Sequence, residues 1–383
     1  MLKKIFSKFI KFAVIIILFL SVSLMLPNNL FDFWDFRNNL WGPAHLLVGL
    51  HNPYLIKQLY PDSTATWVPM FLGLFFPLGW LSFGLASRIW FAFTLLSIGF
   101  LFLFVFKPGR ITPLKLAAVL LLVIFFPPVI ENLSQGQVSI QVVLCLFLAA
   151  FCLDSNAFVW SGFFCVMALT KPQLCLLVLP GLLIAAFRNK GIPGLLKLTA
   201  AAAAWFCLLL VPLFAAFPGW VPQFIANLQG NTAWALPSLF YLFSQLWGSG
   251  LGTAAWSGVA LILFILNIWI WLKFPPKEAV VWSLALTCLI PPYIWSWDFV
   301  LLLPCLLYLL NKYKSGIRFN LLLVGFLTGS LLMWRARWGI QISDQVFVWV
   351  PVYLITIYLL VENFHRIRPF WKTDKKPGPV SGS

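Results

Sequence analysis

The chain carries very little charge. Of its 383 residues, 9% are Asp, Glu, Lys or Arg and 62% are hydrophobic, and the mean hydropathy is +0.95. Soluble domains contain about 25% charged residues, so this composition excludes one. Apolar runs recur from end to end, and most are long enough, or nearly so, to cross the ~30 Å hydrocarbon core of a bilayer. The sequence therefore predicts an all-α polytopic membrane protein.

Paired cysteines and nucleotide-binding loops are also missing. The seven cysteines all lie inside apolar runs and form no CxxC pair, which argues against a disulfide framework or a zinc site. No glycine-rich nucleotide loop and no Asp-x-Asp motif occur, so no cofactor is predicted and the grounds for a divalent metal are weak. The net charge of +16 lies in short loops between apolar runs, as expected beside a bilayer and not of a nucleic-acid-binding protein.

The N-terminus lacks a small-x-small cleavage site after its first apolar run, 10–27. This run follows four lysines and is followed by further apolar segments, which predicts an uncleaved first helix and not a signal peptide. Placing those lysines in the cytoplasm puts the loop 28–66 on the extracytoplasmic side.

The segment 67–82 decides how the rest of the chain is threaded. If it crossed the membrane, the basic loops 107–115 and 187–197 would lie outside, against the positive-inside rule. Its Pro69, Pro77 and Gly79 favour a re-entrant or interfacial segment instead. The chain then makes about twelve crossings, with both termini inside. After the first helix, the expected spans are 87–106, 114–130, 137–153, 157–170, 173–187, 196–217, 252–273, 278–292, 298–311, 318–334 and 344–362.

The distribution of basic residues supports this threading in a plasma membrane. Twenty of the 26 Lys and Arg residues fall on the cytoplasmic side and six on the outside. No internal repeat is seen, so we expect residues 1–365 to form one integral membrane domain and 366–383 to form a disordered basic cytoplasmic tail. The outside loop 218–251 is broken by Pro, Gly and Asn, which indicates interfacial helices.

Polar residues gather at the outer level of the threaded chain. Four distant parts contribute: Asp35, Gln137, Lys171 and Asp298. Polar groups at membrane depth are costly and usually functional. The alternatives are structural: Asp32 or Asp35 as a helix N-cap, Lys171 snorkelling, and Asp298 beside a tryptophan belt. A helix over 36–49 would place Asn39 on the same face as Asp35, and Asp298 is a candidate partner for Lys171.

Several short motifs occur in a characteristic order between residues 10 and 311. Asp35-Phe36 precedes an amphipathic helix, Gly49 and Asn52-Pro53-Tyr54 follow it, and then come WVPMFLGLFFPLGWL, Gly136-Gln137, Lys171-Pro172-Gln173 and Pro292-Tyr293 with Asp298. In this order and spacing the chain resembles glycosyltransferase family 87. Tyr60-Pro61 and Trp297 depart from the family pattern.

This resemblance implies a C-type glycosyltransferase fold and a hexosyltransferase, with mannose favoured, that uses a polyprenyl-phosphate-linked donor. The acceptor would be a lipid or glycan hydroxyl. A single base that activates this hydroxyl for direct displacement implies inversion of the anomeric configuration. By resemblance Asp35 is the catalytic base, with Asp32 as the fallback. A departing phosphate needs a cation, for which Lys171 is the candidate and Arg37, Arg88, Arg335 and Arg337 are alternatives. Gln137, Asn39 and Asp298 complete the expected substrate-binding set.

Two other functions fit a polytopic protein. A transporter or flippase of lipid-linked sugars or other solutes would carry ionisable groups near mid-membrane and often internal repeats. An O-antigen polymerase or ligase would have its large outside loop in the C-terminal half. Here the outer edge carries the polar groups and the longest outside loop follows the first helix, so a glycosyltransferase is the favoured interpretation.

Overall fold

The computed structural model describes residues 32–61, 63–106, 112–229 and 236–363. These residues form helices and loops with no strand among them, which confirms the all-α prediction. Five helices are long and apolar enough to cross a membrane, or six if one bent pair counts as a span. The expected first helix and basic tail lie outside the described residues, so the twelve crossings and the C-type fold stay predictions.

Most expected spans correspond to helices. Span-length helices are α5 (Phe83–Val105) and α15 (Ile317–Trp334), while η8 (Asp344–Val348) continues into α16 (Trp349–Glu362). The other matches are shorter: α8 (Ser139–Asp154), α9 (Phe158–Ala168), α13 (Pro276–Thr287) and α14 (Leu303–Tyr313).

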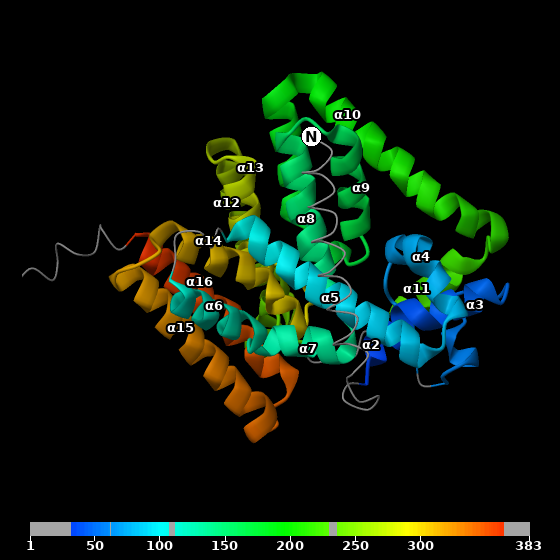
Figure 1. The fold of residues 1–383 in the computed structure, drawn as a ribbon, viewed down its shortest axis with the longest axis horizontal. Coiled ribbons are helices and arrows are strands. Elements are labelled where there is room, and N and C mark those ends of the chain that lie inside the picture. The colour runs from blue at the N-terminus through cyan, green and yellow to red at the C-terminus, as the bar shows by residue number, and fades with distance from the viewer. Residues whose placement is uncertain (1–31, 62, 107–111, 230–235, 364–383) are drawn as a thin grey trace, which may run out of the picture.

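Two long helices are interrupted at glycines. Within α10 (Val178–Ala216), Gly191 has φ 64° and ψ −155°, so two helical arms meet in a turn that only glycine adopts without strain. This turn lies in the basic loop expected between two spans, and Figure 1 shows the two arms of α10. Within α12 (Leu239–Lys273), Gly248 at φ 78° separates a short first helix from a longer second one. With α11 (Trp220–Gln229), that short helix fits the interfacial helices predicted for 218–251.

One expected span is broken in the middle. The segment 114–130 is two helices, α6 (Pro113–Ile124) and α7 (Pro127–Gln135), bent by 57°. The break falls just before Pro127 because proline disfavours a helical conformation in the residue before it and suits the first turn of a new helix. As a result, α7 runs on to Gln135, and its polar residues Glu131 and Asn132 are helical and buried.

The segment 67–82 forms only α4 (Met70–Phe75) and η3 (Phe76–Trp80), neither of span length. The expected helix at 36–49 is present as α2 (Trp34–Phe36), η1 (Arg37–Trp41) and α3 (Gly42–Val48). Gly79 lets η3 lie directly on α3, since a Cβ there would approach the Ala44 carbonyl oxygen to 2.3 Å. Figure 1 places α3, α4 and α11 together at one side of the molecule.

The loops that carry the polar motifs meet at one end of the helices. Helices α8 and α10 begin there and α9 ends there, because α9 packs between them as an antiparallel neighbour. The turn between α13 and η6 (Ser296–Leu302) reaches the same place, where Asp298 bonds to Lys171. The fold thereby assembles one polar site from segments far apart in the sequence.

Candidate active site

The chain enters the site through a tight turn. Asp32 is exposed, and its Oδ1 accepts a hydrogen bond from the Trp34 backbone N–H at 3.1 Å, which forms a turn just before the first helix. Phe33 adopts the left-handed region at φ 47°, and its N–H donates to the Ser134 carbonyl of α7 at 3.0 Å. The turn directs Asp35 inward, where its exposed fraction is 6%. Neither aspartate is the N-cap of this helix, whose N-cap residue is Phe33; Asp32 forms the turn before it.

Asp35 is a buried carboxylate with two amide donors. Its Oδ1 accepts from Asn39 Nδ2 at 3.1 Å, and its Oδ2 accepts from Gln137 Nε2. Burial raises the pKa of Asp35 to about 7, because removal from water disfavours the charged form. The positive charge of Lys171 acts in the opposite direction, while Asp298 adds to the rise. A carboxyl group that titrates near neutrality can take up a proton during a reaction.

Asn39 fixes Asp35 relative to the following loop. Its Nδ2 bonds both the side chain and the backbone carbonyl of Asp35, each at 3.1 Å. Its Oδ1 accepts from the backbone N–H of Thr66 at 2.7 Å and of Trp67 at 3.3 Å. The amide therefore has partners on both sides, which identifies Asn39 as a positioning residue for the carboxylate.

Gly136 sets the approach of Gln137 to Asp35. It ends α7 in the left-handed region at φ 68°, and its carbonyl accepts from Trp90 Nε1 at 2.8 Å. A Cβ at this position would lie 2.5 Å from the Cβ of Phe36. Both the backbone conformation and the contact with the helix of Asp35 therefore require glycine.

Replacing Gly136 tests this arrangement. We expect Gly136→Ala to cost about 1–3 kcal/mol in the free energy of unfolding, because it adds backbone strain and a clash, and to lower activity by moving Gln137. Thermal unfolding and activity of the purified variant measure both effects. The matched control is Gly258→Ala, at a glycine of α12 whose added Cβ would meet nothing within 4 Å. Equal behaviour of the two variants would contradict the requirement.

Lys171 is the cation of the site, and all three of its ammonium protons have acceptors. Its Nζ lies 2.7 Å from Gln137 Oε1, 3.0 Å from Ser139 Oγ and 2.9 Å from Asp298 Oδ1. The ion pair with Asp298 is almost fully buried. The suggested pairing of Lys171 with Asp298 is thus present, and snorkelling does not describe a lysine held in this way.

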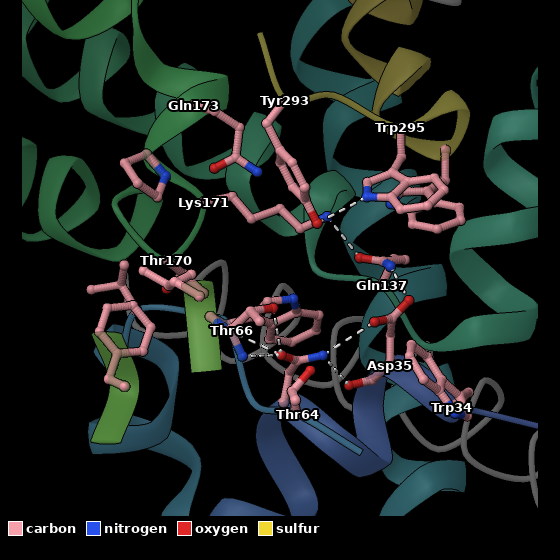
Figure 2. A pocket seen from close by; sticks show the side chains of 17 residues that line it. Trp34, Asp35, Thr64, Thr66, Gln137, Thr170, Lys171, Gln173, Tyr293 and Trp295 are labelled. Atoms are coloured by element: carbon pink, nitrogen blue, oxygen red, sulfur yellow. Dashed lines mark hydrogen bonds between the residues drawn. The ribbon is translucent and has the colours of Figure 1, made fainter. Parts of the chain in front are cut away.

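Asp298 holds this pair in place. Its Oδ1 also accepts from Ser139 Oγ at 2.6 Å, and its Oδ2 accepts from the Trp295 backbone N–H at 3.2 Å, which caps η6. Hydrogen bonds from Asp35 to Gln137, from Gln137 to Lys171 and from Lys171 to Asp298 therefore form a continuous path between two carboxylates. Figure 2 shows the part of this path from Asp35 to Lys171. Gln137 is the neutral link in its middle.

A cavity of about 590 Å³ opens beside this path. The Tyr293 hydroxyl on its wall accepts from Trp295 Nε1 at 3.0 Å, and burial raises the pKa of Tyr293 to about 12, so it stays a neutral hydroxyl. In Figure 2, Asp35 and Trp34 lie on the right of the view, and Thr170 lies on the left. The cavity is lined by Trp34, Asp35, Asn39, Thr64, Thr66, Trp67, Val68, Gln137, Thr170, Lys171, Pro172, Gln173, Phe224, Leu228, Tyr293, Trp295 and Trp297.

The expected arginines do not line this cavity. Arg37 Nε donates to Asn38 Oδ1 at 3.1 Å, and its guanidinium lies 4.3 Å from the centre of the Tyr60 ring. Arg337 instead pairs with Glu131 at 2.7 Å and with Asp344 at 3.0 Å. Arg37 points away because it follows Asp35 by two positions on the same helix, and such neighbours face different directions.

Arg337, Glu131, Asp344 and Ser296 form a polar cluster outside the cavity lining, next to the start of η6. Ser296 Oγ lies 3.1 Å from Glu131 Oε2 and 2.5 Å from Asp344 Oδ1, so its single hydroxyl proton is shared between two carboxyl groups, and the Ser296 backbone N–H donates to Asp344 Oδ2 at 3.2 Å. Asn132 Nδ2 donates to the Trp297 carbonyl at 2.7 Å. These contacts attach the start of η6 to α7 and η8, and so hold Asp298 toward Lys171.

Sequence reasoning did not single out Ser139, the hydroxyl of Tyr293 on the cavity wall, or Phe224 and Leu228. Ser139 follows Gln137 by two residues at the start of a helix, which was a usable signal. No local pattern marks Phe224 or Leu228, because an apolar residue in an interfacial helix has the same appearance whether it faces lipid or a cavity.

The comparisons with known proteins identify the family of the chain. The model of glycosyltransferase family 87 matches residues 66–292, more than half of the chain. Gln137 and Lys171 lie within the matched region, whereas Asp35 and Asp298 lie outside it. No curated protein matches the chain.

Proposed function

Since the chain belongs to glycosyltransferase family 87 and is a membrane glycosyltransferase, we propose that it transfers a hexose, with mannose favoured, from a polyprenyl-phosphate donor to a hydroxyl of a lipid or glycan acceptor. The observation that carries the proposal is Asp35 on the cavity wall, a buried carboxyl group whose pKa is raised to about 7. Such a group is ionised often enough at neutral pH to act as a base.

In the proposed reaction the acceptor oxygen attacks the anomeric carbon of the donor sugar. Its proton passes to Asp35, the new glycosidic bond forms, and the bond between the anomeric carbon and the phosphate oxygen breaks with its electron pair remaining on the phosphate. Direct displacement inverts the anomeric configuration. The buried position of Asp35 limits competition by water for the donor.

The leaving phosphate gains negative charge, which Lys171 would stabilise from the cavity wall. Lys171 acts here mainly through its charge, because its three protons already have acceptors in the protein. Asp298 and Ser139 hold the ammonium in position. Arg37, which the sequence suggested as a substrate ligand, has no place in this mechanism because it does not line the cavity.

Direct transfer tests the proposal. Purified protein in detergent or liposomes is incubated with polyprenyl-phosphate mannose labelled in the sugar and with membrane lipid extracts, and labelled products are separated. We expect label in a glycolipid or glycan with inverted anomeric configuration. Movement of intact donor across the liposome membrane without transfer would support the flippase alternative instead.

We also propose that the site faces the extracytoplasmic side of the plasma membrane and that both termini are cytoplasmic. Leu50, in the loop after α3, and Lys190, beside the Gly191 turn, are both exposed and lie on opposite sides in this threading. In a background lacking Cys152 and Cys207, the two cysteines that are not buried, we expect an impermeant maleimide to label Leu50→Cys in intact cells. Lys190→Cys should react only after permeabilisation; the reverse pattern would invert the topology.

A further inference from the structure

Three side-chain amides line the active-site cavity, and the protein itself uses two of them. Asn39 and Gln137 both donate to Asp35, and their oxygens accept from other parts of the protein. The third amide belongs to Gln173, which is half-buried. In the part of the chain that the structure describes, its side chain has no hydrogen-bond partner. Its two N–H donors and its carbonyl oxygen are therefore available to a bound molecule.

A short 3₁₀ turn, η5 (Pro172–Cys175), fixes the position of Gln173. Proline suits the first position of such a turn because its missing N–H would have no partner there. The Leu174 N–H donates to the Lys171 carbonyl at 3.0 Å, and Leu174 and Cys175 are buried. Successive residues of a 3₁₀ turn point in directions about 120° apart. Burial of Leu174 and Cys175 therefore leaves Gln173 on the side of the cavity.

Tyr293 supplies a second free donor in the cavity lining. Its hydroxyl accepts from Trp295 Nε1 at 3.0 Å, and among the described residues its own proton has no acceptor. In Figure 2, Gln173 and Tyr293 lie in the upper part of the view. Asp35 lies in the lower part, with Lys171 between. Because all three ammonium protons of Lys171 have acceptors in the protein, direct hydrogen bonds to a molecule on the upper side come from Gln173 and Tyr293.

A free amide fits a sugar hydroxyl better than a phosphate. A hydroxyl both donates and accepts, so it can bond to either end of an amide, whereas an ionised phosphate oxygen only accepts. In the proposed reaction Lys171 faces the phosphate on the anomeric carbon, and Gln173 follows Lys171 by two residues. The ring carbon that carries a hydroxyl next to the anomeric carbon is C2. Hydrogen bonds to the C2 hydroxyl also strengthen in the transition state when the bond at the anomeric carbon breaks.

We propose that Gln173 is a specificity-determining residue whose amide bonds to the C2 hydroxyl of the transferred sugar, with Tyr293 as a second donor to the same sugar. The proposal rests on the proposed glycosyltransferase function and concerns the sugar, not the lipid chain or the acceptor. Mannose and glucose differ only in the configuration at C2. A hydrogen bond to the hydroxyl on this carbon therefore favours one of these two hexoses over the other.

The test compares three donors on the same undecaprenyl phosphate: mannose, its 2-deoxy analogue and its 4-deoxy analogue. We expect the wild-type kcat/KM to be roughly tenfold lower for the 2-deoxy donor than for mannose, the net effect of one hydrogen bond. Gln173→Leu should lower kcat/KM for mannose by roughly this factor and leave the 2-deoxy donor within about twofold of wild type. The 4-deoxy donor keeps its C2 hydroxyl and should respond to the substitution as mannose does. Gln173→Ala, which removes the amide without adding apolar bulk, should show the same pattern.

The matched control is Gln58→Leu, the same substitution at an exposed glutamine outside the cavity lining, which should leave all three donors unaffected. If the Gln173 variants lower all three donors equally, as a contact with phosphate or acceptor would, or change none of them, the sugar assignment is overturned while the proposed function stands. If the 4-deoxy donor is the one that becomes insensitive to the substitution, the assignment to C2 is overturned. If wild-type protein transfers sugar from none of the donors, the proposed function itself fails and this inference fails with it.

Discussion

Asp35→Asn is expected to lower kcat for sugar transfer by about 10²–10⁴, the usual contribution of a general base. Asparagine has nearly the same shape and keeps an oxygen that can accept from Asn39 or Gln137, but it cannot take up the acceptor proton. Burial raises the pKa of Asp35 from 3.8 to about 7, so its ionisation costs the folded state free energy that grows as the pH rises from 3.8 and is complete above about 7. The variant should therefore unfold at a temperature no lower than wild type.

The pH dependence of wild-type kcat/KM should report the same group. The base must be ionised to accept a proton, and burial holds the pKa of Asp35 at about 7. Activity should therefore rise as the pH increases through about 7 and fall as the pH decreases below it. A rate that is constant from pH 5 to pH 8 would be inconsistent with a base of about this pKa.

Asp32 supplies the control because it is three residues away, exposed and not in the cavity lining. Asp32→Asn keeps a side-chain oxygen for the Trp34 N–H, and asparagine forms turns of this kind as aspartate does. We expect transfer within a few-fold of wild type. If Asp32→Asn abolished transfer and Asp35→Asn did not, the roles of the two aspartates would be exchanged.

Lys171→Met is expected to have a second large effect, on both stability and activity. Removing one partner of a buried ion pair leaves Asp298 charged and without its counter-ion, which costs about 3–5 kcal/mol in the free energy of unfolding. Activity should fall by about 10²–10³, because the leaving phosphate loses electrostatic stabilisation. Chemical denaturation and single-turnover transfer measure the two losses separately.

A double variant separates the structural role of Lys171 from its proposed catalytic role. In Lys171→Met/Asp298→Asn no uncompensated charge remains, so much of the lost stability should return. Activity should stay low, because the cation is still missing. Recovery of activity together with stability would show that Lys171 only supports the fold, and the phosphate role would have to be abandoned.

The sequence could predict the helices and several site residues because those signals are local. The expected helix over 36–49 predicted the shared face of Asp35 and Asn39, and the resemblance to the family pattern pointed to Asp35 as the acidic residue before it. The break at Phe125–Phe126 was missed, although Pro127 and Pro128 marked the start of a new helix. Arg37 was misplaced among substrate ligands because its chemical type was suitable and its direction on the helix was not considered.

The contacts of Gln137 show what could not be predicted. The sequence placed Gln137 at the outer end of a helix and suggested that it binds substrate. In the structure its amide joins Asp35, 102 positions away, to Lys171, 34 positions away. Both contacts depend on how α7, α8 and the turn before α10 pack together, and the left-handed conformation of Gly136 brings the amide close enough.

The sequence by itself determined the class of protein through its composition and its apolar run lengths. The placement of basic residues determined the expected threading, and with it the expected level of the polar groups. These features could be read from the sequence because water and lipid act on each segment separately. Tertiary structure alone decided that Asp35 is buried while Asp32 is exposed in the preceding turn, that Lys171 is paired with Asp298, and that Phe224 and Leu228 line the cavity. Those outcomes depend on hydrogen bonds and packing between distant segments, which no local pattern in the sequence specifies.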